Sequence, residues 1–168
     1  MKKSIFAVLL MLSMGLPLAA CGESAVSETS NTGQAPAGMY SGHGPSISSD
    51  TFFIRVNGCV LTATLAENSS AKALKALLAE GPLTIDMEDY ASFEKVGELG
   101  LTLPRNDEAI TTEPGDLILY LGKRFVIYYD TNTWNFTRLG KIRDVSQTEL
   151  KAILGDGDVT VTLSLDTL

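Results

Sequence analysis

The stretch Asp116–Ile142, which reads DLILYLGKRFVIYYDTNTWNFTRLGKI, decides the fold that we expect for this chain. Two apolar runs, Leu117–Leu121 and Phe125–Tyr129, flank a short turn signal at Gly122-Lys123 and predict a hairpin. Both runs are apolar at nearly every position, which is typical of strands that are covered on both faces. The sequence therefore predicts that this hairpin lies at the centre of a sheet or of a closed barrel.

Turn and periodicity signals on both sides of this stretch predict the remaining elements. Asn57-Gly58 predicts a hairpin, and Asn68 and Ser146 are typical first residues of capped helices. Alternating apolar residues predict further strands, which begin near Leu83, Phe93 and Val159. The alternation continues through Leu99, Leu101 and Leu103, and residues 105–115 are typical of a polar loop.

The predicted order of elements is strand, strand, helix, five strands, helix, strand. Short strands that greatly outnumber helices are typical of a closed antiparallel barrel, in which a helix covers each open end. We therefore expect a mainly β fold: a closed eight-stranded antiparallel barrel with two short capping helices.

The N-terminal segment predicts a lipoprotein signal peptide over residues 1–20. Lys2 and Lys3 provide a positive start, Ile5–Leu12 is an almost unbroken apolar run, and Leu-Ala-Ala precedes Cys21. The apolar run is too short for a permanent transmembrane helix. This ending resembles the bacterial lipobox, in which the cysteine thiol is acylated and the cysteine becomes the new N-terminus. We therefore expect lipidation of Cys21 and an extracytoplasmic protein anchored to a membrane.

Two further segments follow the signal peptide. Residues 21–50 are rich in Ser, Gly, Ala and Pro and lack apolar periodicity, so they predict a flexible linker behind the lipidated cysteine. Residues 51–168 carry all the strand and helix signals. They predict the single folded domain of the chain.

The charge of the chain argues against a nucleic-acid partner. The formal net charge is −7, and loss of the two positive charges of Lys2 and Lys3 with the signal peptide gives −9. The sequence has no basic cluster, whereas phosphate binding requires a concentrated Lys/Arg footprint. We therefore expect membrane association through the lipid and not through charge.

The residue types also exclude several kinds of chemistry. The one histidine, His43, lies in the predicted linker, so the folded domain lacks Ser-His-Asp or Cys-His catalysis and the usual zinc sites. Lipidation of Cys21 leaves only Cys59, which excludes an intramolecular disulfide, and its alternating strand predicts a buried apolar role. The acidic pairs at 86/88 and 156/158 supply too few oxygen ligands for calcium. We expect no metal and no cofactor.

The order of elements and several short motifs resemble those of cyclophilins. Residues Arg124–Ile127 resemble the cyclophilin strand Gln-Phe-Phe-Ile, Trp134 falls at the spacing of the cyclophilin tryptophan, and Leu139–Ile142 resembles Phe-Gly-Lys-Val. The segment Phe93–Val96 is similar to Phe-His-Arg-Ile, which holds the cyclophilin catalytic arginine. The runs PGDLILY, FVIYY and TRLGKI are similar to those of small bacterial cyclophilin-like domains. The resemblance covers Phe52–Leu165.

The resemblance implies a ligand groove, with departures from the cyclophilin pattern. The implied groove residues are Phe93, Lys95, Val126, Trp134 and Phe136. Lys95 stands where the catalytic arginine would be, Val126 replaces a groove phenylalanine, and Phe136 falls roughly at a groove histidine. Taken without the resemblance, Lys95 is more typical of a solvated residue on an edge strand than of a site residue, and Trp134 is equally typical of core or rim packing.

These departures decide the function that we expect. In cyclophilins an arginine donates into the twisted amide while an apolar groove holds the proline ring, so no nucleophile is needed. Lys95, the one candidate catalytic residue, has an ammonium without the planar fork of donors that arginine has. We therefore expect a lipid-anchored binding module for a peptide or a small molecule, without strong catalysis. The alternative is a weak peptidyl-prolyl isomerase that assists folding.

Overall fold

The computed structural model describes residues 50–167, and these residues form nine strands and two helices. In chain order the elements are β1 (Thr51–Val56), β2 (Cys59–Leu65), α1 (Ser69–Glu80), β3 (Leu83–Tyr90), β4 (Glu94–Glu98), β5 (Glu108–Thr111), β6 (Asp116–Tyr120), β7 (Arg124–Tyr128), β8 (Thr133–Ile142), α2 (Gln147–Leu154) and β9 (Val159–Ser164). The predicted signal peptide, Cys21, the predicted linker up to residue 49 and His43 all lie outside the described residues.

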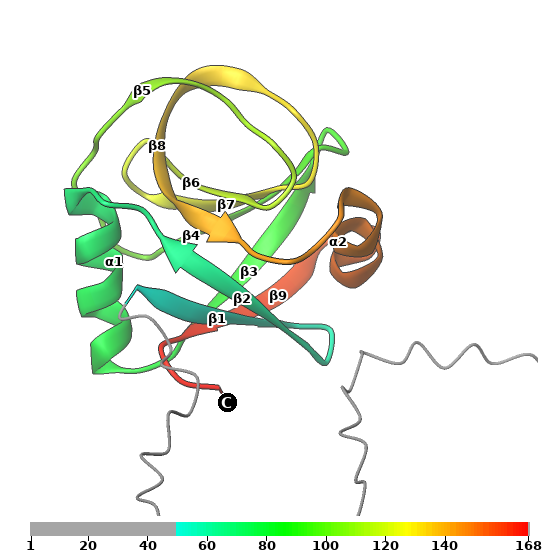
Figure 1. Ribbon diagram of the computed structural model, residues 1–168, viewed down its shortest axis with the longest axis horizontal. Helices are drawn as coiled ribbons and strands as arrows, with labels where there is room; N and C mark the ends of the chain where they lie inside the picture. The colour runs from blue at the N-terminus through cyan, green and yellow to red at the C-terminus, as the bar shows by residue number, and fades with distance from the viewer. Residues whose placement is uncertain (1–49, 168) are drawn as a thin grey trace, which may run out of the picture. The chain divides into compact units, whose positions relative to one another are not determined.

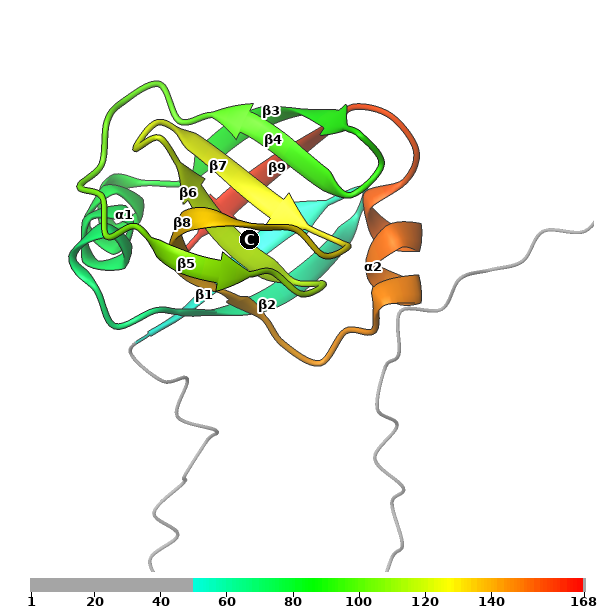
Figure 2. The same cartoon turned by 90° about the horizontal axis from the view of Figure 1, so that it is seen from above.

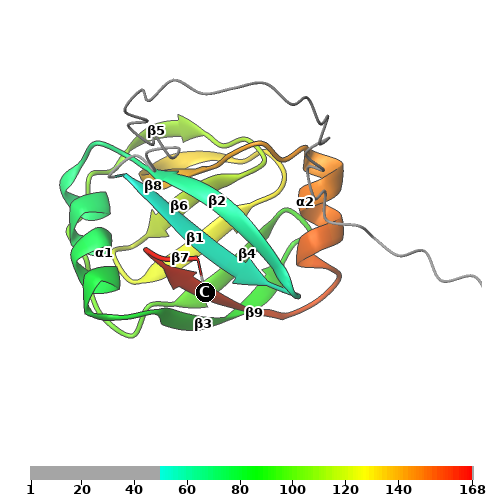
Figure 3. The ribbon, with the colours of Figure 1, turned by 60° about the horizontal axis from the view of Figure 1, so that its bottom comes forward.

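Eight of the strands close into a barrel in which all neighbours are antiparallel (Figure 1). The hydrogen-bonded order is β2-β1-β9-β3-β4-β7-β6-β8, and β8 pairs back to β2 where Leu65 lies opposite Gly140. Figure 3 shows β1 between β2 and β9 on the side of the barrel nearest the viewer. The helices α1 and α2 lie at opposite ends of the barrel (Figure 2). The closed eight-stranded barrel with two helices is confirmed.

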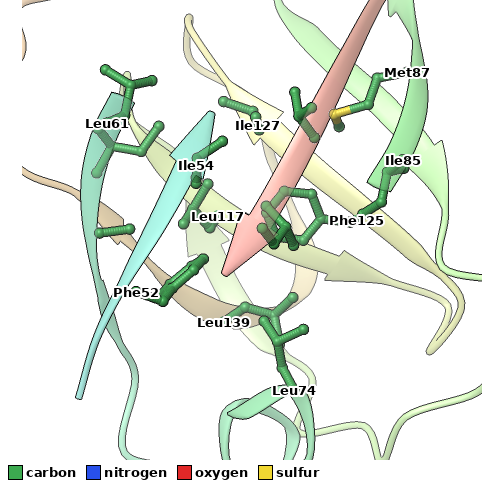
Figure 4. Packing of buried hydrophobic residues seen from close by; sticks show 14 of the residues in the cluster. Phe52, Ile54, Leu61, Leu74, Ile85, Met87, Leu117, Phe125, Ile127 and Leu139 are labelled. Carbon is green, nitrogen blue, oxygen red and sulfur yellow. The ribbon is translucent and has the colours of Figure 1, made fainter. Parts of the chain in front are cut away.

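The hairpin β6–β7 is apolar at nearly every strand position because it separates two apolar clusters. Its inward residues join the barrel interior, where Leu117, Phe125 and Ile127 lie among residues from all sides (Figure 4). Its outward residues are buried in a second cluster on the outer face of the barrel. That second cluster consists of Ile110, Ile118, Val126, Tyr128 and Phe136. The prediction that both faces of this hairpin are covered is confirmed.

Three details differ from the expected elements. The ninth strand, β5, pairs with the outer edge of β8 within the predicted polar loop; Ile110 is its only buried residue, so it shows no alternation. Leu99 and Leu103 are buried but lie outside the sheet, because their N–H groups donate to the β6–β7 turn. Cys59, expected to be buried, is half-buried at the start of β2.

Local capping signals hold the two helices in place. The Asn68 side chain accepts a hydrogen bond from the N–H of Ala71 at 2.8 Å and donates to the carbonyl of Arg138 at 2.7 Å. This one residue therefore both starts α1 and ties it to β8. Ser146 and Glu149 form the predicted capping box at α2. Neither helix of residues 50–167 is long and apolar enough to cross a membrane.

The β6–β7 turn is strained at Leu121. This leucine occupies the turn position that Asn57 occupies in the β1–β2 turn. Leu121 and Gly122 have φ values of 52° and 75°, close to the 48° and 79° of Asn57 and Gly58. Leucine resists positive φ, whereas asparagine tolerates it. Leu121 is also 53% exposed, so its side chain adds little packing. We expect Leu121→Asn to raise the free energy of unfolding by about 0.5–1 kcal/mol in urea denaturation.

The reciprocal substitution provides the control for this prediction. Asn57→Leu should destabilise by at least as much, because the Asn57 side chain also donates to the carbonyl of Ile153 at 2.9 Å. An unchanged or lower unfolding midpoint in Leu121→Asn would show that the turn is not strained.

Candidate functional site

A pocket of about 420 Å³ lies on the outer face of the barrel, over the second cluster. The strands β4, β7, β6 and β8, which lie side by side in Figure 2, supply most of its wall. Side chains on a strand alternate between the two faces of the sheet, so the lining residues of β4, β7 and β8 are spaced two apart. The lining residues are Tyr90, Phe93, Glu94, Val96, Tyr120, Arg124, Val126, Tyr128, Asn132, Trp134 and Phe136.

The structure brings four of the five implied groove residues together in this pocket. Val126 and Phe136 are 2% and 3% exposed and form its floor, and Phe93 lies beside them. Trp134 is 64% exposed and Tyr90 is 59% exposed, so both stand at the rim. A buried floor below an exposed aromatic rim is typical of a ligand pocket.

Contacts between aromatic rings shape the floor of the pocket. Phe93 stacks on Tyr128 with ring centroids 6.1 Å apart and planes at 11°. Tyr128 and Tyr120 each contact Phe136, with ring centroids 5.6 Å and 6.4 Å apart. Because each ring is held by a neighbour, the floor is formed without a ligand.

Glu94 is the one acidic residue in the pocket wall. Its Oε2 atom is shielded from solvent and has no hydrogen-bond partner within residues 50–167. Burial raises the pKa of Glu94 above its usual value, and the nearby Tyr128 hydroxyl partly offsets this effect. The Asn132 amide donates to that hydroxyl at 3.3 Å. Buried polar groups are usually paired, so Glu94 is the lining residue that most needs a hydrogen-bond donor.

Arg124 is the one cationic residue in the pocket wall. Its Nε donates to Oε1 of Glu98 at 2.6 Å, and both side chains are about half exposed. This neighbour raises the pKa of Arg124, first through the hydrogen bond and then through its charge. The charge of Arg124 is therefore balanced within the protein and screened by solvent.

Lys95, in contrast, does not line the pocket, because the alternation along β4 directs it to the other face. Glu94 and Val96 face the pocket, whereas Lys95 pairs with Ile127 and shares its inward face. Lys95 is 0% exposed, and β4 lies between β3 and β7. The structure thus differs both from the implied groove position of Lys95 and from a solvated position on an edge strand.

The buried ammonium of Lys95 joins the barrel to the turn after α2. Its Nζ donates to Oδ2 of Asp89 at 2.5 Å and to the carbonyl oxygens of Gly155 and Gly157 at 2.9 Å and 2.5 Å. Tyr129 also donates to Asp89, at 2.9 Å. Burial alone would raise the pKa of Asp89, but the hydrogen bonds from Lys95 and Tyr129 outweigh it and lower that pKa. Lys95 therefore has a structural role, because it joins β3 to the turn after α2.

A second pocket of about 440 Å³ lies beside this cluster and includes Asp89 and Lys151 in its wall. Asp89 is held by Lys95, and Lys151 pairs with Asp130 at 3.0 Å. These charges are already matched within the protein, so the outer pocket is the better candidate site. Within residues 50–167, no group of three or more His, Cys, Asp or Glu side chains could hold a metal ion.

The fold and the pocket define a class of protein, namely a closed antiparallel barrel with an aromatic pocket on its outer face. Residues 54–164 match the model of the Cyclophilin-like family. Because this match covers most of the chain and nearly all the described residues, the chain belongs to that family.

Comparison with solved structures supports the fold alone, because the sequence identities are low. The solution structure of the hypothetical protein AF2241 from Archaeoglobus fulgidus superposes with a TM-score of 0.52 and 13% identity, covering 69% of this chain and 94% of that one. The structure of McbB in complex with tryptophan gives a TM-score of 0.52 and 15% identity, covering 70% of this chain but only 45% of McbB. No curated protein matches this chain.

The sequence analysis missed Glu94 and Arg124, although both lie inside the motifs that it used. The signal that could have found them is the alternation of the strands. Val96 and Val126 share one face, and period two then places Glu94 and Arg124 on that face and Lys95 on the other. The motif resemblance placed Lys95 in the groove because the alternation of side chains along the strand was not considered.

Proposed function

We propose that this member of the Cyclophilin-like family is a binding module, anchored by lipid on the extracytoplasmic side of a membrane. The outer pocket takes a short peptide segment or a small molecule and does not catalyse a fast reaction. The observation that carries this proposal is the preformed aromatic floor below the exposed Trp134. An indole that is 64% exposed beside a cavity leaves apolar surface for a ligand to cover.

The polar residues of the pocket wall favour binding over catalysis. Its charged residues are Glu94, whose neighbour Tyr128 is held as a neutral phenol by burial, and Arg124, which is paired with Glu98. General acid–base or nucleophilic catalysis requires a reacting group within hydrogen-bond reach of its base. The lining residues include no serine, threonine, cysteine, lysine or histidine, and burial raises the pKa of Tyr128, which disfavours its phenolate form.

Arg124 supports prolyl isomerisation as the second candidate function. Its guanidinium is the one cation that lines the pocket, and it has the planar donor geometry that Lys95 lacks. However, its Nε is already bonded to Glu98. Loss of one well-placed donor typically lowers a rate by about two to three orders of magnitude. We therefore expect isomerase activity at least about a hundredfold below that of a typical cyclophilin.

One titration separates the two functions. An acetylated Ala-Phe-Pro-Phe amide is added to the full chain, binding is followed by Trp134 fluorescence, and cis–trans exchange is measured by NMR. We expect the peptide to bind without faster cis–trans exchange. The Trp134→Ala variant, in which binding is measured from NMR line widths, should bind the peptide about tenfold more weakly. Val60→Ala is the control, because Val60 is 44% exposed and lies outside the pocket. Fast exchange that is lost in Arg124→Ala would favour the isomerase, and unchanged affinity in Trp134→Ala would contradict the site.

The anchor is tested at Cys21. The charged start, the apolar run and the Leu-Ala-Ala before the cysteine support lipidation there. We expect Cys21→Ser to remain unprocessed or to leave the membrane fraction, as shown by fractionation and by the mass of the mature N-terminus. The control is Cys59→Ser, which should be processed normally. A Cys21→Ser protein that is cleaved and sorted like the wild type would contradict the anchor.

A further inference from the structure

The pocket combines an apolar floor with a carboxylate that lacks a partner. Glu94 Oε2 is shielded from solvent, and no donor within residues 50–167 reaches it. The Tyr128 hydroxyl interacts with the same carboxyl group. A buried carboxylate oxygen without a donor is costly, so a ligand that supplies an N–H group would remove this cost.

Aromatic rings are concentrated around this carboxylate. The chain has one tryptophan, five tyrosines and six phenylalanines, and six of these twelve residues line the pocket. They are Tyr90, Phe93, Tyr120, Tyr128, Trp134 and Phe136. The face of an aromatic ring carries negative potential and attracts cations, most strongly in tryptophan. The aromatic rings and Glu94 therefore both favour a positively charged ligand.

We infer that the pocket binds a primary ammonium group, which donates to the carboxylate of Glu94 while its carbon stem packs on the aromatic rings. This inference rests on the proposed binding function and specifies the class of its ligand. A primary ammonium carries three N–H donors, so it can satisfy Oε2 and leave donors for water. The last torsion of a glutamate side chain is soft, so rotation of the carboxylate brings Oε2 to the ligand.

The other polar groups of the pocket are compatible with a cationic ligand. Arg124 is the one positive charge in the wall, and its ion pair with Glu98 at 2.6 Å reduces its repulsion of a second cation. Tyr128 is held as a neutral phenol, because burial and then Glu94 raise its pKa. Asn132 donates to the Tyr128 hydroxyl, and its amide oxygen accepts from the N–H of Thr133 at 2.8 Å, so this neutral side chain is fixed beside Tyr128.

The experiment compares charged and neutral ligands of the same shape. Trp134 is the only tryptophan of the chain and stands at the pocket rim, so the fluorescence of the full-length protein reports on this site alone. The first pair of probes is phenethylammonium and 2-phenylethanol. The second pair is N-acetyl-lysine methylamide and N-acetyl-norleucine methylamide. We expect the ammonium member of at least one pair to bind about tenfold more tightly, and the pair identifies a free amine or a peptide lysine as the source.

Glu94→Gln tests the residue that carries the inference. This variant should bind the ammonium and its neutral partner with equal affinity, and its thermal midpoint without ligand should be no lower than that of the wild type. If Glu94 served only to stabilise the fold, Glu94→Gln would lower the thermal midpoint, so the loss of preference and an unchanged midpoint would not occur together. The control is Glu80→Gln, which removes the same charge from an exposed position at the end of α1, outside the pocket, and should keep the tenfold preference.

Each remaining outcome also decides the question. Equal affinity of the wild type for charged and neutral probes would overturn the ammonium inference but leave the binding function intact. Absence of binding by all four probes would overturn the inference and also count against the proposed pocket. If Glu94→Gln does not fold, the comparison of probes on the wild type decides alone.

Discussion

Replacing Lys95 by methionine should lower the free energy of unfolding by about 3–5 kcal/mol, the usual cost of removing one partner from a buried ion pair. Methionine has a similar length but supplies no donor. The Asp89 carboxylate would lose its cation, and the carbonyl oxygens of Gly155 and Gly157 would lose their N–H donor. Urea unfolding followed by circular dichroism measures the change. A loss below about 1 kcal/mol would show that this cluster is not important for stability.

Two comparisons make this prediction specific to the cluster. Lys72→Met removes an exposed lysine from α1 and should change the stability by less than about 0.5 kcal/mol. Asp89→Asn combined with Lys95→Met should cost less than the sum of the two single changes, because both remove the same ion pair. Strict additivity would indicate that the two side chains do not act together.

The same position also tests the cyclophilin resemblance. Lys95→Arg would be expected to restore isomerase activity if Lys95 occupied the groove. Because Lys95 is 0% exposed and faces away from the outer pocket, an arginine there would not supply a donor to that pocket, and its planar fork does not match the oxygens that bind the ammonium. We expect Lys95→Arg to be less stable than the wild type and to show no gain in cis–trans exchange.

Gly140→Ala should destabilise the protein by about 3 kcal/mol, because the barrel closes at this residue. A Cβ atom at Gly140 would lie 2.3 Å from the carbonyl oxygen of Thr64 on the neighbouring strand. The obstacle is backbone, so no side-chain rotation relieves it. The pairing of β2 with β8 is short, with Leu65 opposite Gly140 at one end and Ala63 opposite Ile142 at the other. Separation of these strands would open the barrel.

Amide exchange and a second glycine variant complete this test. Gly140→Ala should reduce the protection of the Arg143 and Ala66 amides more than that of amides in β3 and β9, because the former donate to Thr62 and Leu139 across the closure. Gly100→Ala is the control: φ is 75° there, but no atom lies within 4 Å of the added Cβ. We expect it to cost about 1 kcal/mol. Equal costs for the two variants would show that the contact with Thr64 is not limiting.

Local signals in the sequence were sufficient for most elements of this fold. Asn57-Gly58 specifies a turn because asparagine and glycine accept positive φ, and both residues have it. Asn68 and Ser146 begin helices because their side chains bond to backbone N–H groups three residues later. The apolar runs of β6 and β7 indicated burial on both faces, and this is what a barrel hairpin with an outer cluster requires.

The composition of the pocket and the role of Lys95 depend on contacts between distant parts of the chain. Strand β5 is recognisable only from its pairing with β8, because Ile110 is its single buried residue. Lys95 resembled a groove residue in its motif, but the groups that bind its ammonium include Gly155 and Gly157, about sixty residues away. A motif describes neighbours along the chain. The face that a side chain occupies, and the groups that it meets there, follow from strand register and barrel closure, which are set by long-range pairing.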